Sequence, residues 1–115
     1  METNSNPILE LTLDFSLDII DFAEMLESRR KYVISRQILK AGTSIGANVH
    51  EAQSPESKAD FIHKMKISDK ESRETEYWLK LCQRSKHYPN CEDLMLKLKV
   101  IQKILSKIIG NSRNN

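Results

Sequence analysis

Residues whose side chains could carry chemistry gather near the middle of the chain, between Ala41 and Ala52. A helical pattern places Ser44, Asn48 and Glu51 close together along this stretch. A serine attacks a substrate only when a general base, usually histidine, takes its proton. His50 lies on the same predicted helix but points elsewhere, and no nucleophile elbow is present. We therefore expect no catalytic residues and no cofactor.

The same stretch predicts a buried polar cluster. Gly42 and Gly46 each cost a helix up to about 1 kcal/mol relative to alanine, so a structural gain must offset them. Small residues facing one another would let the second and third predicted helices approach closely, and polar atoms brought inside then need partners. Such a cluster would fix helix register, as a buried asparagine does in a coiled coil. The expected members are Ser44, Asn48, Glu51, Ser68, Glu71 and Ser72.

Metal-ligating residues do not follow a recognisable spacing. His50, His63 and His87 form no HExxH or similar motif, so no metal site is predicted. Cys82 and Cys91 do not form a CxxC pair. We favour a reduced thiol pair, and a disulfide is the alternative.

Phosphate binding is the chemistry that the charges favour. Residues 1–28 contain seven acids and no Lys or Arg, so the remainder carries all 18 bases against nine acids. Aromatic residues that would stack on bases are absent from the basic regions apart from Tyr32, so sequence-specific reading of single strands is not supported. Lysines late in a helix also suit its dipole, which is the alternative explanation. The candidate nucleic-acid contacts are Arg29, Arg30, Lys31, Arg36, Lys40, Lys97, Lys99, Lys103 and Lys107.

Four helices position these residues. Pro7 after Asn6, and Pro55 in the Ser54–Ser57 run, are typical of helix starts. Short connections make sequential helices antiparallel neighbours. The expected fold is all-α, an antiparallel up-down four-helix bundle in one domain over residues 1–115. Its helices should cover about 7–28, 30–53, 55–86 and 91–109, with Gly110 as a C-cap and a frayed tail at 110–115.

Two of the predicted helices are apolar on two sides. In the first helix, Phe15 and Phe22 follow one stripe while Leu13 and Leu17 lie on nearly the opposite side. The second stripe would face water in a monomer, so we expect a homo-oligomer. A loosely packed monomer with scattered surface apolar residues is the alternative. The expected oligomer interface comprises Leu9, Leu13, Leu17, Ile20, Ile67, Tyr77, Trp78 and Leu81.

Targeting and membrane signals are not evident. No apolar run reaches the roughly 18–20 residues that a membrane span requires. The first ten residues lack the basic and apolar regions of a secretory signal. We expect a cytoplasmic protein that makes no membrane contact.

Two short runs carry a resemblance to a known family. They are SIGANV at 44–49, followed by Glu51-Ala52, and KESRETEYWL at 70–79, with Phe61 between them. The region from Ser35 to Leu81 thereby resembles the bacterial 23S rRNA intervening-sequence protein family, also called four helix bundle or S23 ribosomal proteins. The resemblance implies a four-helix bundle assembled as a ring-like homopentamer. It also implies kinship with accessory proteins of diversity-generating retroelements, which are basic pentamers that partner a reverse transcriptase and nucleic acid.

The residues and the resemblance together predict a non-catalytic, homo-oligomeric protein. We expect it to bind RNA or DNA non-specifically through its basic surfaces. The alternative is a protein-interaction adaptor or scaffold that has no nucleic-acid role and docks on a protein such as a reverse transcriptase.

Overall fold

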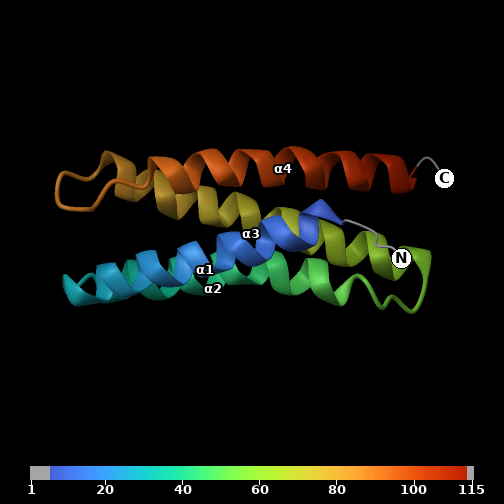
Figure 1. Cartoon of the computed structure of the whole chain (residues 1–115), viewed down its shortest axis with the longest axis horizontal. Coiled ribbons are helices and arrows are strands. Elements are labelled where there is room, and N and C mark those ends of the chain that lie inside the picture. The colour runs from blue at the N-terminus through green and yellow to red at the C-terminus, as the bar shows by residue number, and fades with distance from the viewer. Residues whose placement is uncertain (1–5, 114–115) are drawn as a thin grey trace.

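Four helices account for most of the chain. The structure, a computed structural model, describes residues 6–113 and contains no strand within them. The helices are α1 (Pro7–Ser28), α2 (Tyr32–Glu51), α3 (Lys58–Arg84) and α4 (Glu92–Arg113). Figure 1 shows each helix returning alongside the one before it, in a molecule of 47 × 27 × 22 Å. The expected all-α fold is confirmed.

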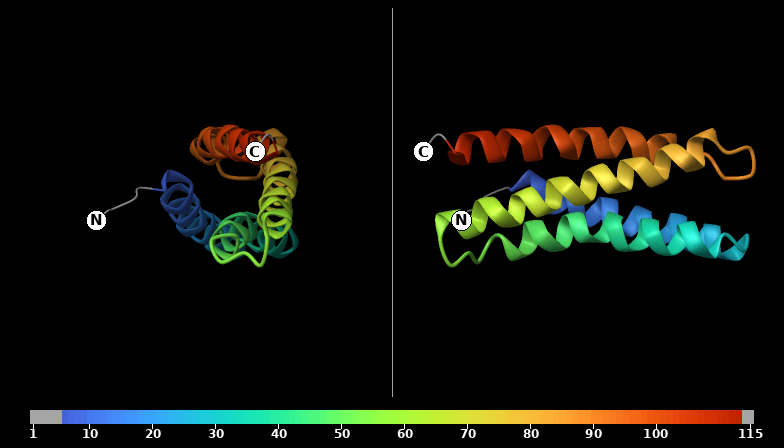
Figure 2. Two further views of the ribbon diagram at one scale, coloured as in Figure 1. Left: turned by 90° about the vertical axis from the view of Figure 1, so that its right-hand side faces the viewer. Right: turned by 180° about the vertical axis from the view of Figure 1, so that it is seen from behind.

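The helices differ in how closely they pack. α2 packs closely against both α1 and α3, whereas α4 packs mainly on α3 and only sparsely on α1. The view along the long axis in Figure 2 shows α2 between α1 and α3, with α4 completing the group. α2 is therefore enclosed on two sides, and α4 is the most peripheral helix.

One apolar core lies between the four helices. α1 contributes the stripe that its spacing predicted, including Ile8, Phe15 and Ile19, each at most 2% exposed. α3 contributes small polar side chains at its centre instead, because Ser68 and Ser72 occupy core positions and are fully buried. The middle of the bundle is thus narrow and partly polar.

A side-chain cap sets the start of α3. The helix was expected from residue 55 but begins at Lys58. Ser57 is extended, with φ −165° and ψ 170°, and its Oγ accepts a hydrogen bond from the backbone N–H of Asp60 at 3.0 Å. This cap satisfies a free N–H of the first turn and leaves residues 55–56 outside the helix.

Three further bounds differ from the expected ones. α2 covers 32–51 rather than 30–53, because residues 29–31 form the turn that closes α1. α3 ends at Arg84 rather than 86, because Ser85 is extended with ψ 136°. α1 covers the expected range, although Asn6 makes no side-chain cap and donates its Nδ2–H to Gln53 instead, at 3.3 Å.

The prediction that Gly110 ends the fourth helix is wrong. α4 continues to Arg113, and Gly110 has no positive φ. A glycine closes a helix by adopting the left-handed conformation, which Gly110 does not adopt. No close packing requires a glycine there either, because no atom lies within 4 Å of a Cβ built on it. Of the expected tail, residues 110–113 are helical and 114–115 lie outside the described residues.

Candidate functional site

The glycines of α2 face α1, not the third helix against which they were expected. A Cβ on Gly42 would lie 2.8–2.9 Å from three side-chain carbons of Ile19. A Cβ on Gly46 would lie 3.2 Å from both the Cβ and the backbone oxygen of Thr12. Ile19 and Thr12 belong to α1 and are fully buried. The glycines therefore offset their helix cost by letting α1 pack closely on α2.

Two buried serines join α2 to its neighbours through backbone carbonyls. The Oγ of Ser35 donates to the carbonyl of Ala23 in α1 at 2.7 Å. The Oγ of Ser68 in α3 donates to the carbonyl of Ile45 in α2 at 2.8 Å. A helical carbonyl keeps a second lone pair and can accept such a bond without losing its helical one. Ser68 thus makes the α2–α3 hydrogen bond that was expected of the polar cluster.

The six residues expected to form one buried cluster are not brought together. Ser44 Oγ donates to the carbonyl of Lys40 at 2.6 Å, and Asn48 Nδ2 donates to the carbonyl of Ser44 at 2.9 Å. Glu51 is exposed and pairs with Lys64 of α3 at 3.0 Å. Serine and asparagine side chains in a helix can donate hydrogen bonds to backbone carbonyls of the same helix. These side chains therefore need no partners in a shared cluster.

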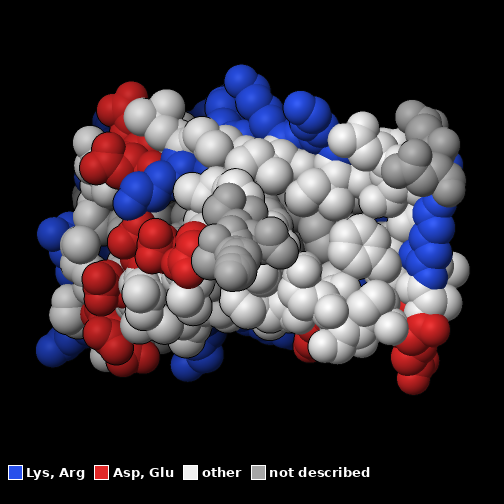
Figure 3. Space-filling model, turned by 45° about the vertical axis from the view of Figure 1, so that its right-hand side comes forward, with Lys and Arg blue, Asp and Glu red and all other residues white. Residues whose placement is uncertain are grey.

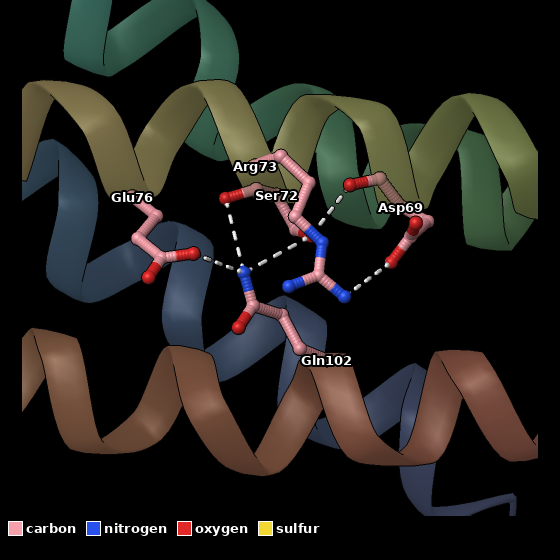
Figure 4. A network of polar contacts seen from close by, with 5 residues as sticks. All are labelled: Asp69, Ser72, Arg73, Glu76 and Gln102. Carbon is pink, nitrogen blue, oxygen red and sulfur yellow. Dashed lines mark hydrogen bonds and ion pairs between the residues drawn. The ribbon is translucent and has the colours of Figure 1, made fainter.

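A different polar network joins α3 to α4 (Figure 4). Gln102 Nε2 of α4 donates to Glu76 Oε1 at 3.1 Å and lies 3.4 and 3.5 Å from the carbonyl and hydroxyl oxygens of Ser72. Ser72 Oγ donates to the carbonyl of Asp69 at 2.6 Å. Gln102 is buried, so its amide would be costly without partners. Of the expected cluster, Ser72 belongs to this network and Glu71 lies half-buried outside it.

Gln102 was not among the predicted residues, although its spacing signals a core position. It follows Leu98 by four residues and precedes Leu105 by three, on the buried side of α4. The hydrogen bond from Gln102 is the main cause that lowers the pKa of Glu76. Lys80, 3.2 Å away, lowers the same pKa further, while partial burial opposes both. The network therefore holds an ionised carboxylate at the α3–α4 interface.

α4 presents three of the candidate phosphate-binding lysines on its outer face. Lys99, Lys103 and Lys107 are exposed and take part in none of the ion pairs among residues 6–113. Lys97 pairs with Asp18 of α1, and this hydrogen bond raises the pKa of Lys97. Figure 3 shows basic side chains along the upper edge of one face and acidic side chains gathered on its left. Lys97 is thus engaged within the chain, unlike the other three.

The second basic region lies at the α1–α2 turn and on the first half of α2. Lys31 Nζ lies 5.3 Å from the centre of the Tyr88 ring, a cation–π distance. Tyr88 belongs to the α3–α4 loop, so this contact joins the loop to the turn. The remaining candidates here are exposed, namely Arg29, Arg30, Arg36 and Lys40.

Apolar side chains are exposed on the outer side of α1, where an oligomer contact was expected. Leu13 is 48% exposed and Leu17 is 56% exposed, while Leu9 and Ile20 are half-buried. We call these four residues the α1 apolar face. Leu13 and Leu17 lie away from the core stripe, and residues 6–113 leave about half of each side chain uncovered.

A second exposed set lies on α3. Tyr77 is 57% exposed and Leu81 is 41% exposed, while Trp78 and Ile67 are half-buried. Tyr77 and Trp78 meet edge to face with ring centres 5.3 Å apart, and Trp78 Nε1 donates to Glu74 at 3.1 Å. We call Ile67, Tyr77, Trp78 and Leu81 the α3 apolar face.

Groups capable of metal binding or catalysis are dispersed. In the part of the chain that the structure describes, no three His, Cys, Asp or Glu side chains are placed to hold a metal ion. His50 Nδ1 lies 2.8 Å from the carbonyl of Gly46 in its own helix. Cys82 and Cys91 are buried free thiols, and burial raises the pKa of Cys82 to about 12. Among the described helices, none has both the length and the apolar character to cross a membrane.

A protein-family model and a solved structure both match this chain over most of its length. The family model for the 23S rRNA-intervening sequence protein matches residues 4–107. A solved structure from Bacteroides thetaiotaomicron, described as a protein with unknown function from the S23 ribosomal protein family, is 40% identical with a TM-score of 0.85. The alignment covers 89% of this chain and 97% of that one. None of the curated proteins compared with the chain matches it. The resemblance seen in the sequence is therefore confirmed, and the chain belongs to the 23S rRNA-intervening sequence protein family.

Proposed function

We propose that this chain is a non-catalytic, homo-oligomeric helical scaffold that binds RNA or DNA non-specifically. The observation that carries the proposal is the outer face of α4, which we call the lysine ridge. Its Lys99, Lys103 and Lys107 repeat every fourth residue and are exposed, with no ion pair among residues 6–113. Lysines in such a row can each neutralise a phosphate. Contacts of this kind carry no sequence information, so the binding is non-specific.

The two apolar faces support assembly. α1 and α3 do not pack closely against each other, so their exposed faces belong to separate parts of the surface. Contact between the α1 apolar face of one copy and the α3 apolar face of the next is heterologous, and it closes into a ring when the rotation fits. Each large apolar side chain buried there contributes roughly 1.5–3 kcal/mol. We propose a cytoplasmic ring of five up-down bundles, the number that the family resemblance implies.

A ring also explains how a modest basic surface could act. Three lysines on one copy make a weak site. Copies held in one assembly present their ridges to the same strand, so that later contacts become intramolecular and the overall affinity rises. The unit that binds nucleic acid is then the assembly and not the single chain.

A protein-interaction adaptor is the second candidate, and the α3 apolar face favours it. Tyr and Trp are enriched in protein interfaces, and Tyr77 and Trp78 form an exposed pair. The kinship with retroelement accessory proteins that the family resemblance implies would make a reverse transcriptase the partner. In that case the lysine ridge faces an acidic partner or keeps the protein in solution.

RNA binding at about 50 to 300 mM salt tests the proposal. We expect the wild-type protein to bind at the lowest salt and to weaken steeply as salt rises, because counterions are released on binding. The triple variant Lys99→Glu, Lys103→Glu, Lys107→Glu should bind at least about fivefold more weakly, the contribution of one phosphate contact. The matched Lys→Arg triple variant keeps the charges and should bind like the wild type.

Two results would overturn parts of this proposal. If the wild-type protein binds neither RNA nor DNA at the lowest salt, the nucleic-acid role is wrong and the adaptor is favoured. If light scattering gives a monomeric mass at micromolar concentration, the scaffold is not an oligomer.

A further inference from the structure

Two acid-free segments meet at one end of the bundle. Neither residues 28–50 nor residues 77–91 contain Asp or Glu. The first segment includes the α1–α2 turn and the second includes the α3–α4 loop. Both connections lie at the left end of the molecule in Figure 1, and the contact of Lys31 with Tyr88 joins them. Charges that are distant in the sequence are therefore close in space.

Basic side chains from both connections gather at this end. All of them except Lys31 are exposed, and none takes part in an ion pair among residues 6–113. Lys97 differs, because it is near acids of α1 and pairs with one of them. We call this set the basic end, and its members are Arg29, Arg30, Lys31, Arg36, Arg84 and Lys86.

Helix dipoles account for only part of the basic end. The carboxyl ends of α1 and α3 lie here and favour cations, but the amino ends of α2 and α4 lie here too and disfavour them. Lys31 is the N-cap residue of α2, and the first turn of α2 contains no acid. A cation at that position is opposite to the usual preference. Four acids also lie at this end, namely Glu24, Glu27, Glu92 and Asp93. The six bases outnumber them and form no ion pair with them among residues 6–113, so the excess of positive charge favours an anionic partner.

Arg30 occupies a backbone position that normally belongs to glycine. It has φ 64° and is the one positive-φ residue other than glycine among residues 6–113. Its N–H donates to the carbonyl of Glu27 at 2.9 Å, and the N–H of Lys31 donates to the carbonyl of Leu26 at 2.8 Å. These bonds close α1 in the way that a C′ glycine usually does. An arginine here is strained, and strained backbone positions cluster at functional sites.

We propose that the basic end is the main surface through which this protein contacts nucleic-acid phosphates, and that Arg30 is a phosphate-binding residue held there despite the fold's preference for glycine. The proposal rests on the nucleic-acid role proposed above and says where that role is carried out. Arginine suits it, because a guanidinium binds two phosphate oxygens at once. The lysine ridge lies on α4 and no member of the basic end does, so the two surfaces can be tested independently.

A comparison of two double variants with the same change of charge tests this location. Arg84→Glu with Lys86→Glu alters the basic end and leaves the turn that closes α1 intact. Lys103→Glu with Lys107→Glu alters the lysine ridge. For a single-stranded RNA at about 0.1 M salt, we expect the first variant to lose roughly 20-fold or more in affinity, because two phosphate contacts contribute about 25-fold there. The second variant should lose less than about fivefold, the contribution of one such contact. Circular dichroism should show both variants folded.

Arg30 is tested by substitutions that separate charge from backbone conformation. Arg30→Gly should raise the melting temperature by about 4 °C, because the strain is relieved. The same variant should bind RNA about fivefold more weakly, the loss of one phosphate contact. Arg30→Lys keeps the charge and should retain most of the affinity. An affinity that is unchanged in Arg30→Gly would show that Arg30 does not bind phosphate.

Other outcomes have separate meanings. If the wild-type protein binds no nucleic acid, the proposed function fails and this inference fails with it. If the wild-type protein binds and the ridge variant loses more affinity than the variant at the basic end, or both lose equally, the proposed function stands and this location is wrong. If polyglutamate of equal charge binds as tightly as RNA, the basic end recognises an acidic protein and not phosphates.

Discussion

α2 and α4 are held in the bundle by different means. α2 approaches its neighbours through residues without long side chains: Gly42 and Gly46 meet α1, and Ser68 of α3 reaches a carbonyl of α2. α4 packs less closely. Leu98, Ile101 and Leu105 enter the shared core, and its polar links are made by long side chains, Gln102 to α3 and Lys97 to α1. A helix fixed by backbone approach has almost no freedom of position, whereas one fixed by long side chains can adjust.

This difference agrees with the proposal that α1, α2 and α3 form the scaffold and that α4 carries the lysine ridge. The runs that carry the family resemblance, 44–52 and 70–79, lie in α2 and α3, on the closely packed side of the bundle. The lysine ridge lies on α4, the most peripheral helix. Steric packing restricts residue type strongly, and a charged outer face restricts it weakly. The runs that carry the family resemblance therefore lie in the closely packed part of the bundle, and the proposed lysine ridge lies outside them.

The largest expected effect comes from adding one methyl group between α1 and α2. Gly42→Ala places a Cβ within 2.8–2.9 Å of three side-chain carbons of Ile19, which is fully buried and must shift within the core. Overpacking of a core costs about 1–3 kcal/mol, and the gain in helix propensity returns at most about 1. We expect the free energy of unfolding to fall by about 2 kcal/mol in urea titration at fixed protein concentration.

The other two glycines are matched controls for this variant. Gly46→Ala meets atoms of Thr12 at 3.2 Å, a milder contact, and the propensity gain of about 1 kcal/mol should leave stability nearly unchanged. Gly110→Ala meets nothing within 4 Å and should stabilise α4 by up to about 1 kcal/mol. If all three variants were equally stable, close approach would not be what distinguishes α2 from α4.

A smaller effect is expected from the hydroxyl that joins α3 to α2. Ser68→Ala removes the 2.8 Å bond to the carbonyl of Ile45 and should cost about 1 kcal/mol of unfolding free energy, the usual worth of a buried hydrogen bond. Ser44→Ala is the control, because that hydroxyl bonds within its own helix and is half-buried. Its loss should be neutral within about 0.5 kcal/mol. Equal losses in the two variants would contradict the bridging role of Ser68.

Features set by a few neighbouring residues could be predicted from the sequence. Pro7 begins α1, and the Ser57 cap of Asp60 begins α3 close to the expected point. The left-handed turn at Arg30 could not be predicted, because glycine is the usual signal for it. The opposite holds at Gly110. A glycine is present there, but it keeps a negative φ and α4 continues to Arg113, so the expected helix end was wrong.

Features set by distant residues could be predicted only in part. The sequence singled out the small residues of α2. Which neighbouring helix Gly42 and Gly46 face depends on how the helices are arranged around α2, and residue spacing alone does not predict that arrangement. The polar cluster was expected among serines and Asn48, whereas the partner that Ser72 finds is Gln102, 30 residues away. The pairing of Lys97 with Asp18 joins residues 79 apart and likewise needs the tertiary fold.

The smallest effect on stability at neutral pH is expected at the α3–α4 network, where it should appear instead as a change in acid sensitivity. Gln102→Leu fills the same space without polar atoms, so stability at pH 7 should change by less than about 1 kcal/mol. The pKa of Glu76 lies below its usual value of 4.5, so its ionised form stabilises the fold above that pH. This contribution is lost as the pH falls through the lowered pKa. Because Gln102 is the main cause of the shift, the variant should lose less stability than the wild type between pH 7 and pH 3, and its Glu76 should titrate at higher pH by NMR. An unchanged Glu76 titration would mean that α4 is not held through this bond.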